Sequence, residues 1–306
     1  MSYLQPPEMM SHMKFSKYYM AALSAFAIWG FFSLVLRPIG TYPSLDILFY
    51  RVFSCAVLMV IVSLLFRRKI WRQNKEAFKD MPSSQKRKIV GLTLGGGVFL
   101  TANWFFFIYV MNHINLKAAS FAYLVCPIMT TVLAYFILKE KLSKWQWTAV
   151  LLSVFSCLLL SFNNLTDVFY SLVVALSYAL YLVSQRKNNE LDRFLLLTFQ
   201  ITFSALMLLP FYPHYSGPLP ASAFFYWSIL LIAVLFTIIP LFLNLYALQG
   251  VNSSTMGILL YINPLINFIL AIFYFHEEIN KFQIVAYCLI FLSILIFNEQ
   301  HLFRKR

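Results

Sequence analysis

Arg51 is the residue with the clearest chemical potential, because it carries a charge inside the long apolar run 45–66. An unpaired charge in hydrocarbon is costly, so Arg51 is expected to face the protein interior or a polar cavity. There it would contact an anion or a carboxylate, or form an ion pair at a gate. Two structural alternatives stay open: extension toward the outer membrane interface, or a pair with Asp46, five residues earlier.

Other polar and aromatic side chains lie within apolar runs and could line the same pathway. A lipid-facing asparagine would leave its amide unsatisfied, so each asparagine is expected to face inward. There it would bond another helix or contact a substrate. The predicted pathway residues are Trp29, Arg51, Asn103, Trp104, Tyr123, Tyr178, Tyr181, Asn244, Tyr261, Asn263 and Asn267.

Two prolines, Pro127 and Pro264, lie inside apolar runs and predict helix kinks. Proline lacks a backbone donor and clashes with the preceding turn, so it frees carbonyl groups. Kinks of this kind can open space for a ligand near the membrane midplane. A packing kink without ligand contact is the alternative.

Catalytic and metal-binding constellations are not apparent in the sequence. The four cysteines lie in apolar runs without C-x-x-C spacing, and no cluster of His, Asp and Glu stands out. We therefore predict no catalytic residue, no metal and no cofactor.

The composition requires most of the chain to lie in lipid. Of 306 residues, 61% are hydrophobic and 11% are charged, with a mean hydropathy of +0.74. A soluble domain carries about 25% charged residues. The fold class is therefore an all-α polytopic membrane protein. Apolar runs predict ten transmembrane helices at 17–37, 45–66, 89–111, 116–138, 145–162, 165–185, 193–210, 223–247, 253–275 and 281–298.

The distribution of Lys and Arg predicts that both termini are cytoplasmic. With that orientation, 20 of the 24 basic residues lie on the cytoplasmic side and three on the other. The net charge of +13 then reflects topology and attraction to anionic membrane lipid, not nucleic-acid binding. The basic loop 67–88 could instead form a helix in the membrane interface. Residues 1–13 are expected to be an N-terminal extension and 301–306 a basic cytoplasmic tail.

Glycines cluster at the start of the third predicted helix. Gly91 and Gly95 form a G-x-x-x-G pattern, and Gly96 and Gly97 follow directly. Small residues let helices approach closely, so this stretch is expected to pack tightly against a neighbour, with a flexible gate as the alternative.

A self-match at an offset of 137 residues divides the chain into two copies. The segment 140–146 (EKLSKWQ) aligns with 277–283 (EEINKFQ), and Pro127 aligns with Pro264. The predicted copies are 14–163 and 164–300, each with five helices. An odd number of helices inverts the second copy, and inverted repeats are typical of secondary transporters.

Glu140 and Glu277 occupy matching positions in the two copies, at the ends of apolar runs. We expect a structural role for both, capping or pairing where neighbouring helices join, with proton coupling as the alternative. None of the eleven acidic residues lies deep in an apolar run, and coupled carriers generally need such a group. The sequence therefore favours facilitated transport or exchange.

Matching stretches in both copies give the chain a resemblance to the EamA family of the drug/metabolite transporter superfamily, and within it to the RarD-like branch. The resemblance covers about residues 14–298. It is carried by Ile28-Trp29-Gly30, Asp46, Arg51-Val52, Asn103-Trp104, Asn112-His113, Ala119-Ser120, Tyr123, Pro127, Glu140, Tyr181, Arg186-Lys187, Ile239-Pro240, Ser254-Thr255, Gly257, Tyr261, Pro264, Phe275 and Glu277.

The resemblance implies a ten-helix carrier in the bacterial inner membrane that moves small metabolites or drugs, often outward. The expected function is a secondary transporter that works by alternating access, an exporter or exchanger with a small-molecule substrate. A membrane-embedded enzyme acting on a lipid or isoprenoid substrate is the alternative. A homodimer is a further possibility that the sequence leaves open.

Overall fold

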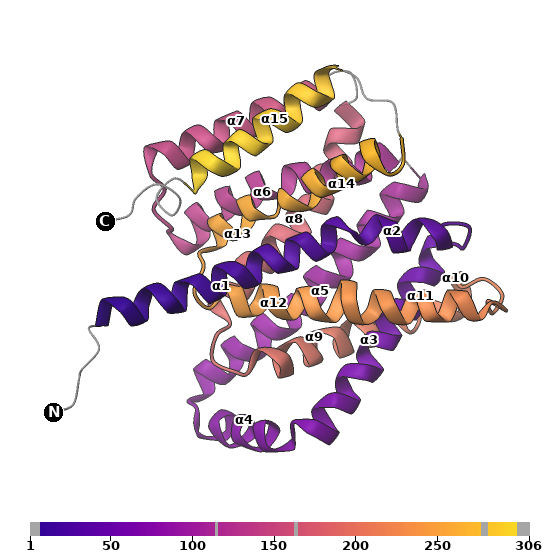
Figure 1. Cartoon of the computed structure of the whole chain (residues 1–306). Coiled ribbons are helices and arrows are strands. Elements are labelled where there is room, and N and C mark those ends of the chain that lie inside the picture. The colour runs from indigo at the N-terminus through magenta and orange to yellow at the C-terminus, as the bar shows by residue number, and fades with distance from the viewer. Residues whose placement is uncertain (1–6, 114–115, 162–164, 277–280, 299–306) are drawn as a thin grey trace.

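The chain forms a layered bundle of helices joined by short connections (Figure 1). A computed structural model describes residues 7–113, 116–161, 165–276 and 281–298, and all regular structure in these ranges is helical. Its first half contains α1 (Pro7–Gly30), α2 (Phe32–Leu36), the 3₁₀-helix η1 (Arg37–Ile39), α3 (Ser44–Phe66), α4 (Arg68–Asp80), α5 (Ser83–His113), α6 (Leu116–Leu138) and α7 (Lys144–Ser161).

The second half of the chain contains more interrupted helices than the first. It contains α8 (Leu165–Lys187), α9 (Arg193–Leu208), α10 (Tyr212–Tyr215), α11 (Ala223–Ala233), the π-helix η2 (Val234–Ile238), α12 (Ile239–Ala247), α13 (Ser253–Leu259), α14 (Ile262–Phe273) and α15 (Lys281–Phe297). Each of the ten predicted apolar runs is mostly helical over its described residues, with interruptions such as the turn at 260–261. Glu277 and the tail 301–306 lie outside the described residues, as do residues 1–6 of the predicted extension.

Five helical stretches in the described part of the chain are long and apolar enough to cross a membrane. They are Lys17–Ile39, Ser44–Phe66, Ser83–Val110, Ala223–Ala247 and Ser253–Phe273. A helix of 23 residues such as the second is about 35 Å long, against a hydrocarbon core of about 30 Å. Four shorter apolar helices accompany them: Ala122–Leu138, Lys144–Leu160, Arg193–Leu208 and Lys281–Phe297.

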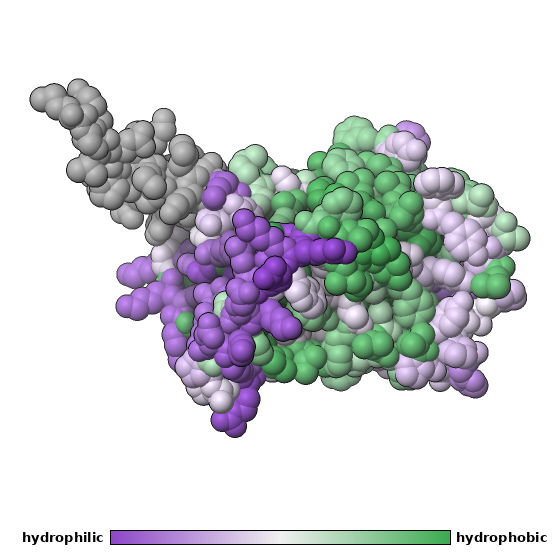
Figure 2. Space-filling model, turned by 90° about the horizontal axis from the view of Figure 1, so that it is seen from below, coloured by the Kyte–Doolittle hydropathy of each residue, from purple (hydrophilic) through white to green (hydrophobic). Residues whose placement is uncertain are grey.

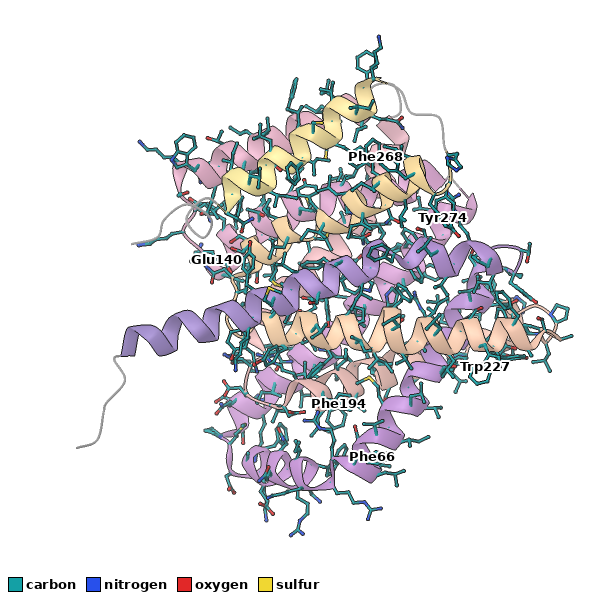
Figure 3. All side chains as sticks on the ribbon, in the orientation of Figure 1. Phe66, Glu140, Phe194, Trp227, Phe268 and Tyr274 are labelled. Carbon is teal, nitrogen blue, oxygen red and sulfur yellow. The ribbon has the colours of Figure 1, made fainter. Side chains whose placement is uncertain are left out.

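Large apolar side chains cover the outside of the bundle. Phe66 and Trp227 project away from their helices (Figure 3) and are 80% and 70% exposed. Exposure on this scale is unfavourable in water, whereas lipid tails solvate such rings without cost. The surface therefore matches a membrane solvent.

The segment 67–88 is helical and not an irregular basic loop. Helix α4 has no buried residue, and hydrophilic side chains gather at this end of the molecule beside a broad hydrophobic face (Figure 2). It is held to the start of α9: the Trp71 ring lies 5.5 Å from that of Phe199, and Asn74 Oδ1 accepts the Asp192 N–H at 2.8 Å. Arg67 also forms an ion pair with Asp192 at 3.2 Å.

Helices from the two halves interleave throughout the bundle. Helix α1 packs against α12 and α14, while α8 packs against α5 and α6. Three further pairs join the halves directly: α3 with α9, α6 with α13, and α7 with α15. The last pair includes hydrogen bonds from Ser153 Oγ to Ser293 Oγ at 3.0 Å and from Ser156 Oγ to the Ala286 carbonyl at 2.8 Å.

Close packing in the middle of α5 involves Gly96 and Gly97, whereas Gly91 and Gly95 face open space. A Cβ at Gly96 would clash with the side-chain amides of Gln185 and Gln200, and one at Gly97 would lie 2.8 Å from the Phe203 ring. The expectation of tight packing in this stretch is thus confirmed for the second pair of glycines only. The G-x-x-x-G pattern was the wrong indicator.

The glycine contact adjoins a buried network of amides between α5, α8 and α9, which we call the amide network (Thr93, Gln185, Asn188, Gln200). Gln200 Nε2 donates to Gln185 Oε1 at 2.6 Å, and Asn188 Nδ2 donates to Thr93 Oγ1 at 3.1 Å. Arg193 donates to the Asn188 carbonyl beside them. Polar groups therefore seal this end of the bundle.

The opposite end is sealed by apolar side chains. Ile39 and Phe225 are completely buried there and pack with Ile47, Ile229 and Ile232. We call these five residues the apolar seal. It joins η1 and α3 of the first half to α11 of the second.

Glu140 ties the end of α6 to the start of α13 (Figure 3). Lys139 adopts a left-handed conformation (φ 57°), and the Glu140 N–H bonds back to the Ala134 carbonyl, which ends α6. The Glu140 carboxylate then accepts the N–H groups of Ser253 and Ser254 at 2.8 and 3.0 Å, and the Ser254 hydroxyl at 2.5 Å. The expected structural role is present, but it caps α13 instead of the neighbouring helix α7.

Gly96→Ala is expected to lower the apparent Tm in detergent, because the new methyl group must displace two hydrogen-bonded amides. Overpacking of this kind costs about 1–3 kcal/mol. Gly95→Ala is the matched control one residue earlier. It meets no atom within 4 Å and gains up to about 1 kcal/mol of helix propensity. Equal Tm values for the two variants would contradict the close contact.

Glu140→Gln is expected to lower the apparent Tm, because a neutral amide keeps one acceptor and replaces the other with a donor facing an N–H group. Hydrogen bonds to a charged group contribute about 1.5–3 kcal/mol each, so the loss should be measurable by thermal unfolding. Glu76→Gln on exposed α4 removes the same charge without such partners. A loss as large in that control would refute the capping role.

Candidate functional site

Arg51 is enclosed by helices and does not extend freely into lipid. It lies seven residues into α3, about 10 Å along the helix axis from Ser44. The centre of its guanidinium lies 5.0 Å from the centroid of the Trp104 ring on α5. Cys55, one turn further along α3, and Tyr123 of α6 lie close enough to interact electrostatically with the guanidinium of Arg51.

The guanidinium of Arg51 has no anionic partner among the described residues. Asp46 is engaged elsewhere, because its carboxylate accepts the Gly217 N–H at 3.0 and 3.3 Å. Arg51 Nε is buried without a hydrogen-bond partner. An arginine at mid-helix costs about 2.5–3.5 kcal/mol on insertion scales, and a desolvated cation–π contact returns about 2 kcal/mol. The described side chains thus leave the charge of Arg51 without full compensation.

A π-helical turn, η2, interrupts the helix that lies across from Arg51. Pro240 has no N–H, so the Phe236 carbonyl four residues earlier receives no hydrogen bond from it. The Ile239 N–H bonds to the carbonyl of Val234, five residues earlier, which makes this turn π-helical. The freed Phe236 carbonyl accepts the indole N–H of Trp29 at 2.9 Å. Trp29 of α1 is thereby fixed against this turn.

Helix α3 contacts the same region of the interrupted helix. The Cys55 thiol lies 3.4 Å from the Ala233 carbonyl, which directly precedes η2. Thr237 Oγ1 donates to the Ile232 carbonyl at 2.9 Å within the turn. Local π-turns are frequent at functional sites, and both α1 and α3 contact this one.

Tyr178 of α8 contacts Trp29 as well. Its ring meets that of Trp29 edge-on at 6.1 Å, and its hydroxyl accepts a hydrogen bond from Asn244 Nδ2 at 2.7 Å. Tyr123 lies within electrostatic range of both Tyr178 and Arg51. We refer to Trp29, Arg51, Trp104, Tyr123, Tyr178 and Asn244 as the central cluster.

Four predicted pathway residues have other surroundings, and a fifth, Tyr181, borders the central cluster, because its ring centroid lies 5.8 Å from that of Tyr178. Asn103 Nδ2 donates to the Val174 carbonyl at 3.0 Å and to Ser177 Oγ at 3.3 Å, which ties α5 to α8. Tyr181 and Tyr261 are completely buried. Asn267 Nδ2 donates to Asn263 Oδ1 at 2.8 Å within α14. Their contact with a substrate stays a prediction.

The two prolines differ in their local structure. Pro127 lies inside the continuous helix α6, and its carbonyl accepts the Thr131 hydroxyl at 2.9 Å. Gly257 lies against it, since a Cβ there would be 3.1 Å from the Pro127 carbonyl oxygen. Pro264 follows an actual break, because α13 ends at Leu259 and α14 begins at Ile262.

The turn η2 and the amide network were not predicted from the sequence. Pro240 inside an apolar run was the available signal for η2, and Gln185 at the end of one such run and Gln200 within the next were the signal for the network. Neither pattern specifies its partners, which come from distant helices. Among the described residues, no group of three or more His, Cys, Asp and Glu side chains could hold a metal ion.

Bacterial proteins of similar length resemble the chain from end to end. It is 28% identical to the uncharacterized transporter YojE of Bacillus subtilis over 97% of this chain and 98% of the relative. It is 28% identical to the protein RarD of Salmonella typhi over 93% of this chain and 95% of the relative. It is 29% identical to the protein RarD of Streptomyces exfoliatus over 89% of this chain and 85% of the relative.

One solved crystal structure shares the fold at 12% identity. It superposes with a TM-score of 0.73 and covers 92% of this chain and 96% of that chain. The model of the EamA-like transporter family matches residues 16–162 and again residues 165–298. The family and the relative YojE are transporters by name, which sets aside the membrane-embedded enzyme. The chain belongs to the EamA-like transporter family and is a multi-pass membrane transporter.

Proposed function

We propose that the transporter is a carrier that works by alternating access, built from inverted copies 14–163 and 164–300 with five spans each. The observation that carries the proposal is the exchange symmetry of the packing. Helix α8 is the counterpart of α1, five spans later, and α5 and α6 are the counterparts of α11–α12 and α13–α14. The contacts of α1 with α12 and α14 are matched by those of α8 with α5 and α6.

Three further pairs each join a helix to its own counterpart, which agrees with a two-fold relation. These pairs are α3 with α9, α6 with α13, and α7 with α15. The backbone repeats as well: Lys139 and His276, 137 residues apart, are the two described non-glycine residues with positive φ, at 57° and 51°. Two copies with one fold can exchange their conformations, and this exchange converts an inward-open state into an outward-open one.

The proposed substrate contacts are the six residues of the central cluster, which come from α1, α3, α5, α6, α8 and α12. Their neutral aromatic and amide groups can bind and orient a small molecule, and Arg51 adds one positive charge. We further propose export or exchange across a bacterial inner membrane, with both termini cytoplasmic. Contacts of basic α4 with anionic lipid, and assembly into a homodimer, are additional predictions.

The inverted arrangement predicts opposite locations for the ends of the two copies. Fusions of alkaline phosphatase and of green fluorescent protein after residue 163 and after Arg306 test it in bacterial cells. Phosphatase activity is expected only after 163, since that enzyme matures outside the cytoplasm. Fluorescence is expected only after Arg306. The same reporter active at both positions would mean that the copies are parallel.

Transport itself is tested in proteoliposomes loaded with labelled amino acids, aromatic drugs and small organic acids. At least one class should leave faster than from protein-free vesicles, and mass spectrometry should find it chemically unchanged. Asn244→Leu removes the hydrogen bond to Tyr178 and should slow this flux about 5- to 10-fold. Conversion of a compound into a new species, or no flux for any class, would refute the carrier.

A further inference from the structure

We propose that the substrates are small organic anions with a planar ring, and that Arg51 binds their anionic group. The inference rests on the proposed function, because it assigns a substrate class to the central cluster. It further implies that the carrier exchanges one anion for another much faster than it returns empty. Two observations and one physical argument support it.

The first observation is the charge balance around Arg51. Its described neighbours Cys55 and Tyr123 carry a thiol and a phenol, which are neutral at pH 7. The nearest acidic residue in sequence, Asp46, is held by Gly217. A carboxylate or sulfonate can match the guanidinium with two parallel hydrogen bonds. The described residues thus supply the cationic half of such a pair and not the anionic half.

The second observation is the aromatic surroundings of that charge. The Trp104 ring lies 5.0 Å from the guanidinium centre, and the Tyr123 ring lies 5.4 Å from Phe107. Further along the cluster, Trp29 meets Tyr178 at 6.1 Å. Aromatic rings pair favourably at such separations, so a planar substrate ring finds more contact here than an aliphatic chain does.

The physical argument concerns the conformational change of the carrier without a bound substrate. Alternating access must pass through a state in which neither water face reaches Arg51. A bound anion neutralises the guanidinium in that state, whereas the empty carrier must desolvate it alone. The empty step should therefore be slower than the loaded step by about one to two orders of magnitude, which makes exchange the dominant mode.

The binding test titrates the purified, detergent-solubilised protein with matched probes by isothermal calorimetry at pH 7.5. Benzoate should bind about 10- to 100-fold more tightly than benzamide, which has the same ring without the charge. Benzoate should also bind more tightly than acetate. Arg51→Met should remove the preference for benzoate over benzamide, and Trp104→Leu the preference over acetate.

Two variants keep this test interpretable if Arg51→Met is unstable. Arg51→Lys keeps the charge and should retain part of the preference for the anion. Arg193→Met removes another buried arginine, one held by the Asn188 carbonyl, and should leave the preference intact. Equal binding of benzoate and benzamide by the wild type would overturn the proposal. So would sodium chloride or phosphate binding as well as benzoate.

The flux test uses labelled benzenesulfonate, which stays ionised and does not cross lipid by itself. Unlabelled benzenesulfonate on the opposite side should accelerate its exit at least tenfold, and Arg51→Met should abolish the acceleration. Benzenesulfonamide should cause none. Arg51-dependent binding without any flux would refute the carrier but keep the anion site. Flux of neutral compounds without preference for anions would keep the carrier and overturn this inference.

Discussion

Broken helices inside a membrane need donors and acceptors from elsewhere, because the hydrocarbon core offers no water to their backbone groups. Three such needs are met by side chains of the first half acting on the second. Trp29 donates to the Phe236 carbonyl, and Cys55 approaches the Ala233 carbonyl. Glu140 accepts from the first N–H groups of α13. These contacts decide where the second half can bend, and they join the two halves at those points.

Arg51 is the contrast within this pattern. Backbone groups freed by Pro240 are satisfied inside the protein, whereas the described residues offer the charge of Arg51 a ring and neutral groups. Arg193 also has guanidinium nitrogens without partners, but it donates to the Asn188 carbonyl. The uncompensated charge of Arg51 is therefore the feature on which the proposed role of the central cluster depends.

Much of the fold could be predicted from sequence, because lipid imposes a strong and local requirement on each span. Twenty apolar residues in a row leave few alternatives to a helix, so helix covers most of the described residues in each of the ten predicted segments. The family followed from residues spread over both halves, and the matches to the two halves agree with it. The inverted relation of the copies stays a prediction.

The contacts of the candidate site were harder to predict, because most of them join residues more than 50 positions apart. Asn103 and Asn244 were expected to face inward, yet one binds a neighbouring backbone and the other the Tyr178 hydroxyl. Nothing local in the sequence separates those two outcomes. The glycines show the same limit, because the orientation of α5 about its own axis decides which of two adjacent glycines faces another helix. Gly96 faces Gln185 and Gln200, whereas Gly95 faces no atom within 4 Å.

The two ends of the bundle are closed by different chemistry, and this difference gives the carrier a temperature dependence. Opening the apolar seal around Ile39 and Phe225 exposes hydrocarbon to water, whereas opening the amide network at Gln185 and Gln200 exchanges amide partners for water. Apolar hydration carries a large heat capacity and becomes less unfavourable on cooling. Under alternating access, cold therefore shifts the resting population toward the state that is open at the isoleucine end, and warming shifts it back.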